Sequence, residues 1–214
     1  MSYLIVPSGH KFLPVQVADA RSHEPLFSNG FAAKKAPHFY PFYTGPQRPE
    51  LNGIQASGKV QGKNLVLTGT VDGPIVTKPK TADLGEIYSF AVDRGDAGKI
   101  GPYPGRPQIR FDAIVNVMIT DKSTTATVAA TTPSTNQPGV KPTKLVTKAV
   151  TIKGPTVTVT VPLSNLPSNG YPDDQWNVNF FARSPKGRPD FHSVASFTPE
   201  HTMFQIFVKR PSTS

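Results

Sequence analysis

The residues best suited to chemistry in this 214-residue chain are carboxylates around a glycine-bearing segment between two apolar runs. Asp93 and Asp96 follow the first run, and Asp112 lies in the second. A hard cation such as calcium prefers clustered oxygen ligands on loops of this kind. Aspartate more commonly caps turns by accepting hydrogen bonds from nearby backbone N–H groups. EF-hand spacing is absent, so calcium at Asp93, Asp96 and Asp112 is a secondary expectation, and no other cofactor is expected.

Other catalytic or metal-binding patterns are missing from the sequence. The five histidines lack the close spacing that usually places two zinc ligands on one face: His10, His23, His38, His192 and His201. The chain has no cysteine, which excludes disulfides and cysteine nucleophiles. It also has no Gly-x-Ser-x-Gly elbow and no phosphate-binding loop. We therefore expect a protein that is not an enzyme, and an enzyme without a recognisable motif is the remaining alternative.

The first fifty residues hold eight of the chain's 20 aromatic side chains and seven of its 23 prolines. Residues 38–46 are too apolar to remain solvated, and their prolines exclude them from a helix or a central strand. We expect residues 1–50 to form an irregular N-terminal arm, with one brief edge strand at 12–17. The arm should adhere either to its own body or to a neighbouring subunit. The residues expected to make this contact are Phe39, Tyr40, Phe42, Tyr43 and Arg48.

From residue 51 onward the chain consists of short apolar runs separated by turn signals. Residues 54–60 and 64–71 flank Gln61-Gly62-Lys63-Asn64, which predicts a β-hairpin. Further strands are expected at 86–92, 109–119, 125–129, 145–152, 156–161, 175–182 and 202–209. Residues 93–107 contain four glycines and three prolines, which predicts a long exposed loop, and 162–167 suit a single helical turn.

Eight or nine short strands without a long helix predict an all-β fold. The favoured architecture is an antiparallel β-sandwich of the immunoglobulin-like or jelly-roll kind, with a closed barrel as second choice. A chain of this length buries one core well but hardly two. We therefore expect an N-terminal arm at 1–50 and a β-sandwich domain at 51–214.

The net charge of +9 reflects a shortage of acids, because charged residues make up only 17% of the chain. Such a shortage is a weaker sign of nucleic-acid binding than a basic block, so we expect no nucleic-acid partner. The chain lacks an apolar run long enough to cross a bilayer, and Met1-Ser2-Tyr3-Leu4-Ile5-Val6-Pro7 lacks the features of a signal peptide. No membrane insertion is expected. The location stays open, with an extracellular surface or a virion favoured over the cytoplasm.

Two strand-turn patterns carry a family resemblance. One runs through Tyr88-Ser89-Phe90-Ala91-Val92-Asp93, a Gly/Pro loop and Arg110-Phe111-Asp112-Ala113-Ile114-Val115. The other runs through Val157-Thr158-Val159-Thr160-Val161-Pro162-Leu163-Ser164-Asn165-Leu166 and Trp176-Asn177-Val178-Asn179-Phe180-Phe181. Together they cover about half of the chain and resemble secreted bacterial β-sandwich domains of the DOMON and carbohydrate-binding-module 9 type. The resemblance implies a binding or surface domain, but the chain lacks a repeated Asp pair in the first loop, so no calcium or sugar site carries over.

These observations lead to two hypotheses from different classes. The first is a structural or interaction protein, a β-sandwich subunit that joins a homo-oligomer or a larger shell, filament or surface layer through its arm. The second is a carbohydrate-binding module that stacks a glycan on Tyr103, in the long loop, or on Trp176.

Overall fold

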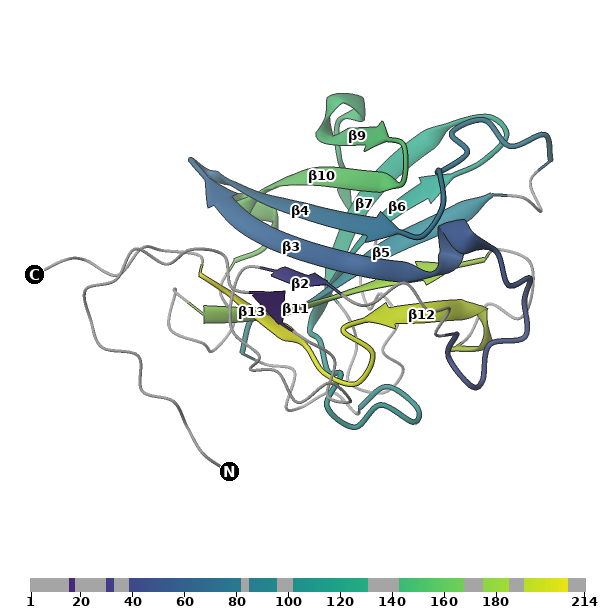
Figure 1. Ribbon diagram of the computed structural model, residues 1–214. Coiled ribbons are helices and arrows are strands. Elements are labelled where there is room, and N and C mark those ends of the chain that lie inside the picture. Colours follow the sequence, from purple (N-terminus) through teal and green to yellow (C-terminus); the bar gives the residue numbers. More distant parts are fainter. Residues whose placement is uncertain are drawn as a thin grey trace, which may run out of the picture.

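The computed structural model describes residues 16–17, 30–32, 39–81, 85–95, 102–130, 143–167, 175–184 and 191–207. Sheet A has the order β1 (Gln16–Val17), β2 (Gly30–Ala32), β3 (Gly53–Gln61), β4 (Asn64–Val71), β10 (Thr156–Pro162) and β9 (Val150–Lys153). Sheet B has the order β12 (Val194–Thr198), β11 (Gln175–Arg183), β5 (Glu86–Asp93), β6 (Ala113–Ile119), β7 (Thr124–Ala130) and β8 (Thr143–Lys144), and β13 (Phe204–Phe207) also pairs with β11. The two sheets lie over each other (Figure 1).

The expected all-β antiparallel sandwich is confirmed. Every strand pairing is antiparallel except the short parallel pair of β1 and β2. The helical segments of the described chain are single turns: η1 (Pro49–Leu51), η4 (Thr147–Ala149), η5 (Leu163–Asn165) and η6 (Phe191–Ser193). In the described residues, no helix is long and apolar enough to span a membrane.

Alternating side chains explain why β4 and β10 pair at the centre of sheet A. The valines of β10 and Leu65, Leu67 and Val71 of β4 are buried in the sandwich, while the threonines of both strands stand with Val66 on the outer face. There, Thr68 Oγ1 lies 3.2 Å from Thr158 Oγ1, and Thr70 Oγ1 lies 3.1 Å from Thr156 Oγ1. Cross-strand pairs of this kind fix the register, because a slip by one residue would turn the valines toward water.

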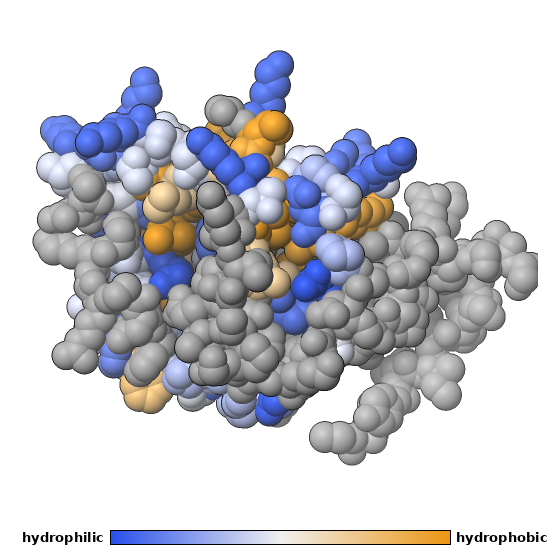
Figure 2. All heavy atoms as spheres, turned by 180° about the vertical axis from the view of Figure 1, so that it is seen from behind, coloured by the Kyte–Doolittle hydropathy of each residue, from blue (hydrophilic) through white to orange (hydrophobic). Residues whose placement is uncertain are grey.

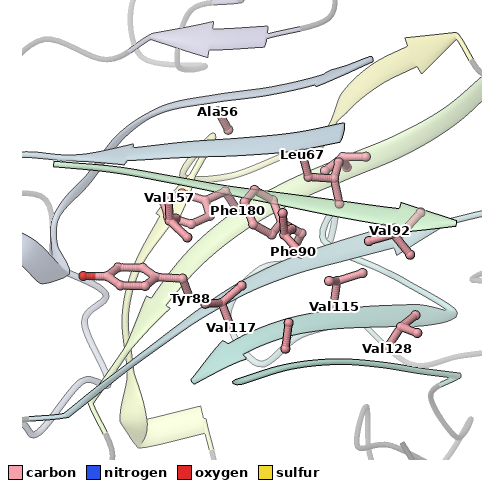
Figure 3. Packing of buried hydrophobic residues seen from close by; sticks show 14 of the residues in the cluster. Ala56, Leu67, Tyr88, Phe90, Val92, Val115, Val117, Val128, Val157 and Phe180 are labelled. Atoms are coloured by element: carbon pink, nitrogen blue, oxygen red, sulfur yellow. The ribbon is translucent and has the colours of Figure 1, made fainter. Parts of the chain in front are cut away.

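The main core lies between the two sheets and is centred on Phe180 of β11 (Figure 3). The Phe180 ring stacks on the ring of Tyr88 with 6.0 Å between the ring centroids, and its centroid lies 5.0 Å from that of the Phe90 ring. Tyr88 and Phe90 both belong to β5. On the side of sheet A, the ring occupies the space above Gly69, where an added Cβ would lie 2.4 Å from it. The glycine in β4 therefore allows the two sheets to approach around this ring.

A second apolar cluster covers the outer face of sheet B. Successive side chains of a strand point to opposite faces of its sheet, so β5, β6, β11 and β12 also carry side chains that face away from the main core. On this outer face they pack against side chains from residues 40–43 and 102–111. Its buried members are Tyr40, Ala91, Tyr103, Ile109, Phe111, Ile114, Ala129, Phe181, Val194 and Phe197. Sheet B is thus covered on both faces, and this second layer positions the candidate site.

Several expected elements differ from the structure. The strand predicted from residue 109 begins at Ala113, because Ile109 and Phe111 pack in the second cluster. The strand expected at 145–152 begins only at Val150, after η4. Strand β12 was not predicted, and β1 and β2 show that the arm is not wholly irregular. The predicted exposed loop at 93–107 is wrong for Tyr103 and Arg106, which are buried.

The predicted hairpin, the strands at 86–92, 125–129, 156–161 and 175–182 and the helical turn near 163 are confirmed. Gly62 in the hairpin turn has a φ of 60°, which a glycine adopts at no steric cost.

Candidate interaction site

Residues 39–44 of the arm lie beside the start of β12 and η6 of the same chain, whereas β1 and β2 of the arm pair in sheet A (Figure 1). The backbone N–H of Tyr40 donates to the carbonyl of Ala195 at 2.7 Å, and the N–H of Thr44 donates to the carbonyl of His192 at 3.2 Å. His192 Nδ1 lies 2.8 Å from the carbonyl oxygen of Phe42. Since β12 is the last strand of sheet B, the bond from Tyr40 to Ala195 covers a backbone carbonyl at the edge of the sheet, and the bonds to His192 hold the arm to η6.

The Tyr40 side chain anchors this contact. Its ring is only 2% exposed and lies edge-on to Phe197, with the ring centroids 5.2 Å apart. Arg106 places its guanidinium carbon 4.9 Å from the centroid of the Tyr40 ring, in cation–π geometry. The Tyr40 hydroxyl donates to the Pro104 carbonyl. We call the receiving residues, Tyr103, Pro104, Arg106, Ala195 and Phe197, the arm-docking surface.

Burial also raises the pKa of the two arm tyrosines above its ordinary value. It raises the pKa of Tyr40 against the opposite effect of the Arg106 guanidinium. It raises the pKa of Tyr43 as well, against a hydrogen bond with Ser184 that lowers it. Each phenol donates a hydrogen bond to a backbone carbonyl, Tyr40 to that of Pro104 and Tyr43 to that of Pro46.

One aromatic side chain of the docked arm, Phe42, is exposed to solvent. Phe39 and Tyr43 are partly buried and stack with centroids 6.0 Å apart. Phe42 is 46% exposed, and every other aromatic side chain whose burial the structure describes is less exposed. The other large apolar side chains that are exposed in the described chain are Val76, Met118 and Val146. Figure 2 shows such apolar areas among projecting hydrophilic side chains on one side of the molecule.

Arg48 connects the arm to a buried acid. Its guanidinium lies 3.2 Å from a Glu50 carboxylate oxygen and 3.6 Å from Glu86 Oε1. The Tyr88 hydroxyl donates to Glu86 Oε2 at 2.5 Å and lies 2.9 Å from the Glu50 carbonyl oxygen. We call Arg48, Glu50, Glu86 and Tyr88 the arm clamp.

Burial raises the pKa of Glu86 to about 7. The hydrogen bond from Tyr88 and the charge of Arg48 lower it, while the charge of Glu50 raises it. Burial, followed by the charge of Glu86, also raises the pKa of Tyr88, so the phenol stays protonated. Glu86 consequently changes its charge near neutral pH.

The two residues expected to stack on a glycan are buried in the structure. Trp176 is 1% exposed and lies in the main core, where its strand pairs with β13. Tyr103 is 8% exposed and contacts Tyr40 and Phe197 in the second cluster. Neither ring offers an open face for a sugar, because each is covered by other side chains.

The expected calcium ligands do not converge on a shared space in the described chain. Asp112 forms a buried ion pair with Arg94, with 2.9 Å between Oδ1 and Nε. Asp93 Oδ1 accepts the N–H of Gly95 at 2.9 Å, which is the turn-capping use. Asp96 lies outside the described residues. Among the residues the structure describes, no group of three or more acidic or histidine side chains is placed to hold a metal ion.

Comparisons with known proteins do not assign the chain to a family. No protein-family model and no curated protein matches the chain. One solved structure similar to it is a "putative carbohydrate-binding protein" from Bacteroides uniformis, with 11% identity and a TM-score of 0.33, over 81% of this chain and 80% of that one. A likeness this distant carries no argument about function. The proposed relation to DOMON and carbohydrate-binding-module 9 domains stays a prediction.

Sequence reasoning identified the arm residues but missed the surface that receives them. Arg106 and Phe197 are separated from Tyr40 by long stretches of chain, and no local pattern marks such a contact. One available signal was Glu86, an acid at the start of an otherwise apolar strand. A carboxyl group at the start of a buried strand is expected to be buried as well, and a buried carboxyl group needs a hydrogen-bond donor or a cation beside it.

Proposed function

We propose that this chain is a non-catalytic structural subunit, a β-sandwich that associates with further copies through its N-terminal arm. The observation that carries the proposal is Phe42, an aromatic side chain of the docked arm that is 46% exposed. Aromatic rings are enriched at protein interfaces, where they bury a large apolar area at low cost in conformational entropy. Repeated association of this kind would build a shell, a filament or a surface layer.

The described acidic groups favour a structural role over a catalytic one. Asp112 pairs with Arg94, and Glu200 lies 3.2 Å from Arg106. Glu86 accepts its hydrogen bond from Tyr88 and is fully buried. A general acid or base has to reach its substrate, and these carboxylates are instead used inside the fold.

Size-exclusion chromatography with light scattering tests this proposal. The comparison uses the full-length protein, Phe42→Ser, and Val76→Ser as the matched control, because Val76 is 48% exposed and Phe42 is 46% exposed. We expect the wild type and Val76→Ser to associate as concentration rises, and Phe42→Ser to associate at least several-fold more weakly. Equal association of all three would place the interface elsewhere, and a wild type that stays monomeric would refute the proposal.

Glycan binding is the second candidate, and the exposed Phe42 ring is the observation that favours it. An exposed aromatic face can stack on the apolar side of a sugar ring. A glycan array should then show binding by the wild type that is lost in Phe42→Ser and kept in Val76→Ser. The absence of binding to every glycan would remove this candidate, and it would leave the assembly proposal untouched.

A further inference from the structure

We propose that the edge of the sandwich around β9 binds the surface of an anionic lipid bilayer. Two described segments form this edge, residues 74–81 and residues 143–155, and we call them together the β9 edge. They meet where the backbone N–H of Ile75 donates to the carbonyl of Gly154 at 2.9 Å. Strand β9 is the last strand of sheet A and lies at the top of the molecule in Figure 1. The β9 edge belongs to other segments than Phe42, so binding here does not depend on self-association through that ring.

The β9 edge carries charge of one sign. Its lysines are all exposed to solvent, and they are Lys78, Lys80, Lys144, Lys148 and Lys153. Neither segment contains an aspartate or a glutamate, and the chain has none between Lys122 and Pro172. Asp72, the acid just before the first segment, is partly buried. An anionic surface is therefore the partner that complements this edge electrostatically.

Two of the exposed apolar side chains lie among these lysines. Val146 is 75% exposed and Val76 is 48% exposed. Each valine directly follows a residue that is buried in the main core, Leu145 in one segment and Ile75 in the other. Backbone hydrogen bonds fix both buried neighbours, since Leu145 donates to the Ala126 carbonyl at 2.8 Å and Ile75 bonds to the β9–β10 turn. Neither valine can therefore turn into the core unless its buried neighbour leaves it.

Apolar side chains among lysines distinguish a bilayer from other anionic partners. A bilayer presents charged headgroups over an apolar interior, so lysines can pair with the headgroups while a valine enters the layer beneath them, and no spanning segment is needed. A soluble polyanion attracts the lysines but offers no apolar interior to the valines. Proteins commonly stack single-stranded nucleic acid on aromatic rings, and the two segments contain none. Figure 2 shows hydrophilic side chains projecting beside an apolar area at the top of the molecule.

Co-sedimentation of the full-length protein with vesicles tests the proposal. The vesicles contain phosphatidylcholine and phosphatidylserine in equal parts, or phosphatidylcholine alone. A basic side chain close to an anionic bilayer strengthens binding by about five-fold, so Lys144→Gln combined with Lys148→Gln should weaken it by roughly 25-fold. Val146→Ser should weaken it by at least about three-fold, because a serine gains little from the apolar layer. The matched control is Lys59→Gln combined with Lys63→Gln, which removes two exposed lysines toward the β3–β4 turn, at the far end of sheet A from the β9–β10 turn.

We expect the wild type and the control pair to bind the phosphatidylserine vesicles alike, to bind phosphatidylcholine alone far more weakly, and to be released by high salt. Full binding by the Lys144 and Lys148 pair would place the contact elsewhere and overturn the proposal. A wild type that binds no phosphatidylserine vesicle, or that binds phosphatidylcholine alone equally well, would also overturn it. Full binding by Val146→Ser, with loss only in the lysine pair, would identify a surface for soluble polyanions in place of a lipid bilayer.

Discussion

The buried carboxyl of Glu86 makes the stability of this protein depend on pH. Its pKa in the folded protein is about 7, above the ordinary value of 4.5. The folded state therefore binds more protons than the unfolded state between these values, and stability falls as pH rises through this window. The difference between the pKa of Glu86 in the folded protein and its ordinary value corresponds to about 3 kcal/mol in the free energy of unfolding. This contribution to stability is present in full below pH ~4.5 and is lost above pH ~7.

The substitution Glu86→Gln removes this dependence, because an amide keeps the acceptor for Tyr88 and cannot ionise. We expect Glu86→Gln to be as stable as the wild type near pH 4.5 and more stable at pH 8 by up to about 3 kcal/mol. Urea unfolding at several pH values, followed by the fluorescence of the single tryptophan, measures the difference. Asp121→Asn, which removes an exposed carboxyl, is the control and should leave the profile unchanged. Parallel profiles for wild type and Glu86→Gln would refute the reasoning.

Three further predictions concern the core. Gly69→Ala would place a Cβ within 2.4 Å of the Phe180 ring, and we expect a loss of about 1–3 kcal/mol in denaturant unfolding. Arg94→Met leaves Asp112 buried without its ion-pair partner and should cost about 3–5 kcal/mol, whereas adding Asp112→Leu should recover much of the loss. Trp176 is buried, so its emission should be blue-shifted and poorly quenched by iodide until the protein unfolds.

Much of the fold could be predicted from local patterns. Where a strand has one face in the core and one in solvent, as β4 and β10 do, the alternation is visible in the sequence. Strand β12 lacks this signal because all of its residues are buried. One face of β12 packs on the main core and the other on the second cluster, and the arm lies at its edge. Its sequence, Val-Ala-Ser-Phe-Thr, therefore does not alternate between apolar and polar residues.

Of the candidate site, the arm could be predicted from the sequence, and the surface that receives it could not. The rings and prolines of the arm show that it must adhere to a surface, and this can be inferred from composition alone. The receiving side chains, Arg106 and Phe197, come from two distant segments that are brought together by the sheet. Trp176 illustrates the reverse error: an aromatic side chain in a strand was considered as a ligand platform, and the structure uses it to fill the core.

Self-association of the whole chain is the central claim, and native mass spectrometry of an isotope mixture tests it most directly. Unlabelled and nitrogen-15-labelled full-length proteins are mixed in equal amounts, incubated and sprayed from a volatile buffer. The account predicts assemblies that contain both isotopes, with a statistical distribution of light and heavy chains. Spectra that show only single chains of 23.1 kDa and their labelled equivalents, at every concentration, would contradict it.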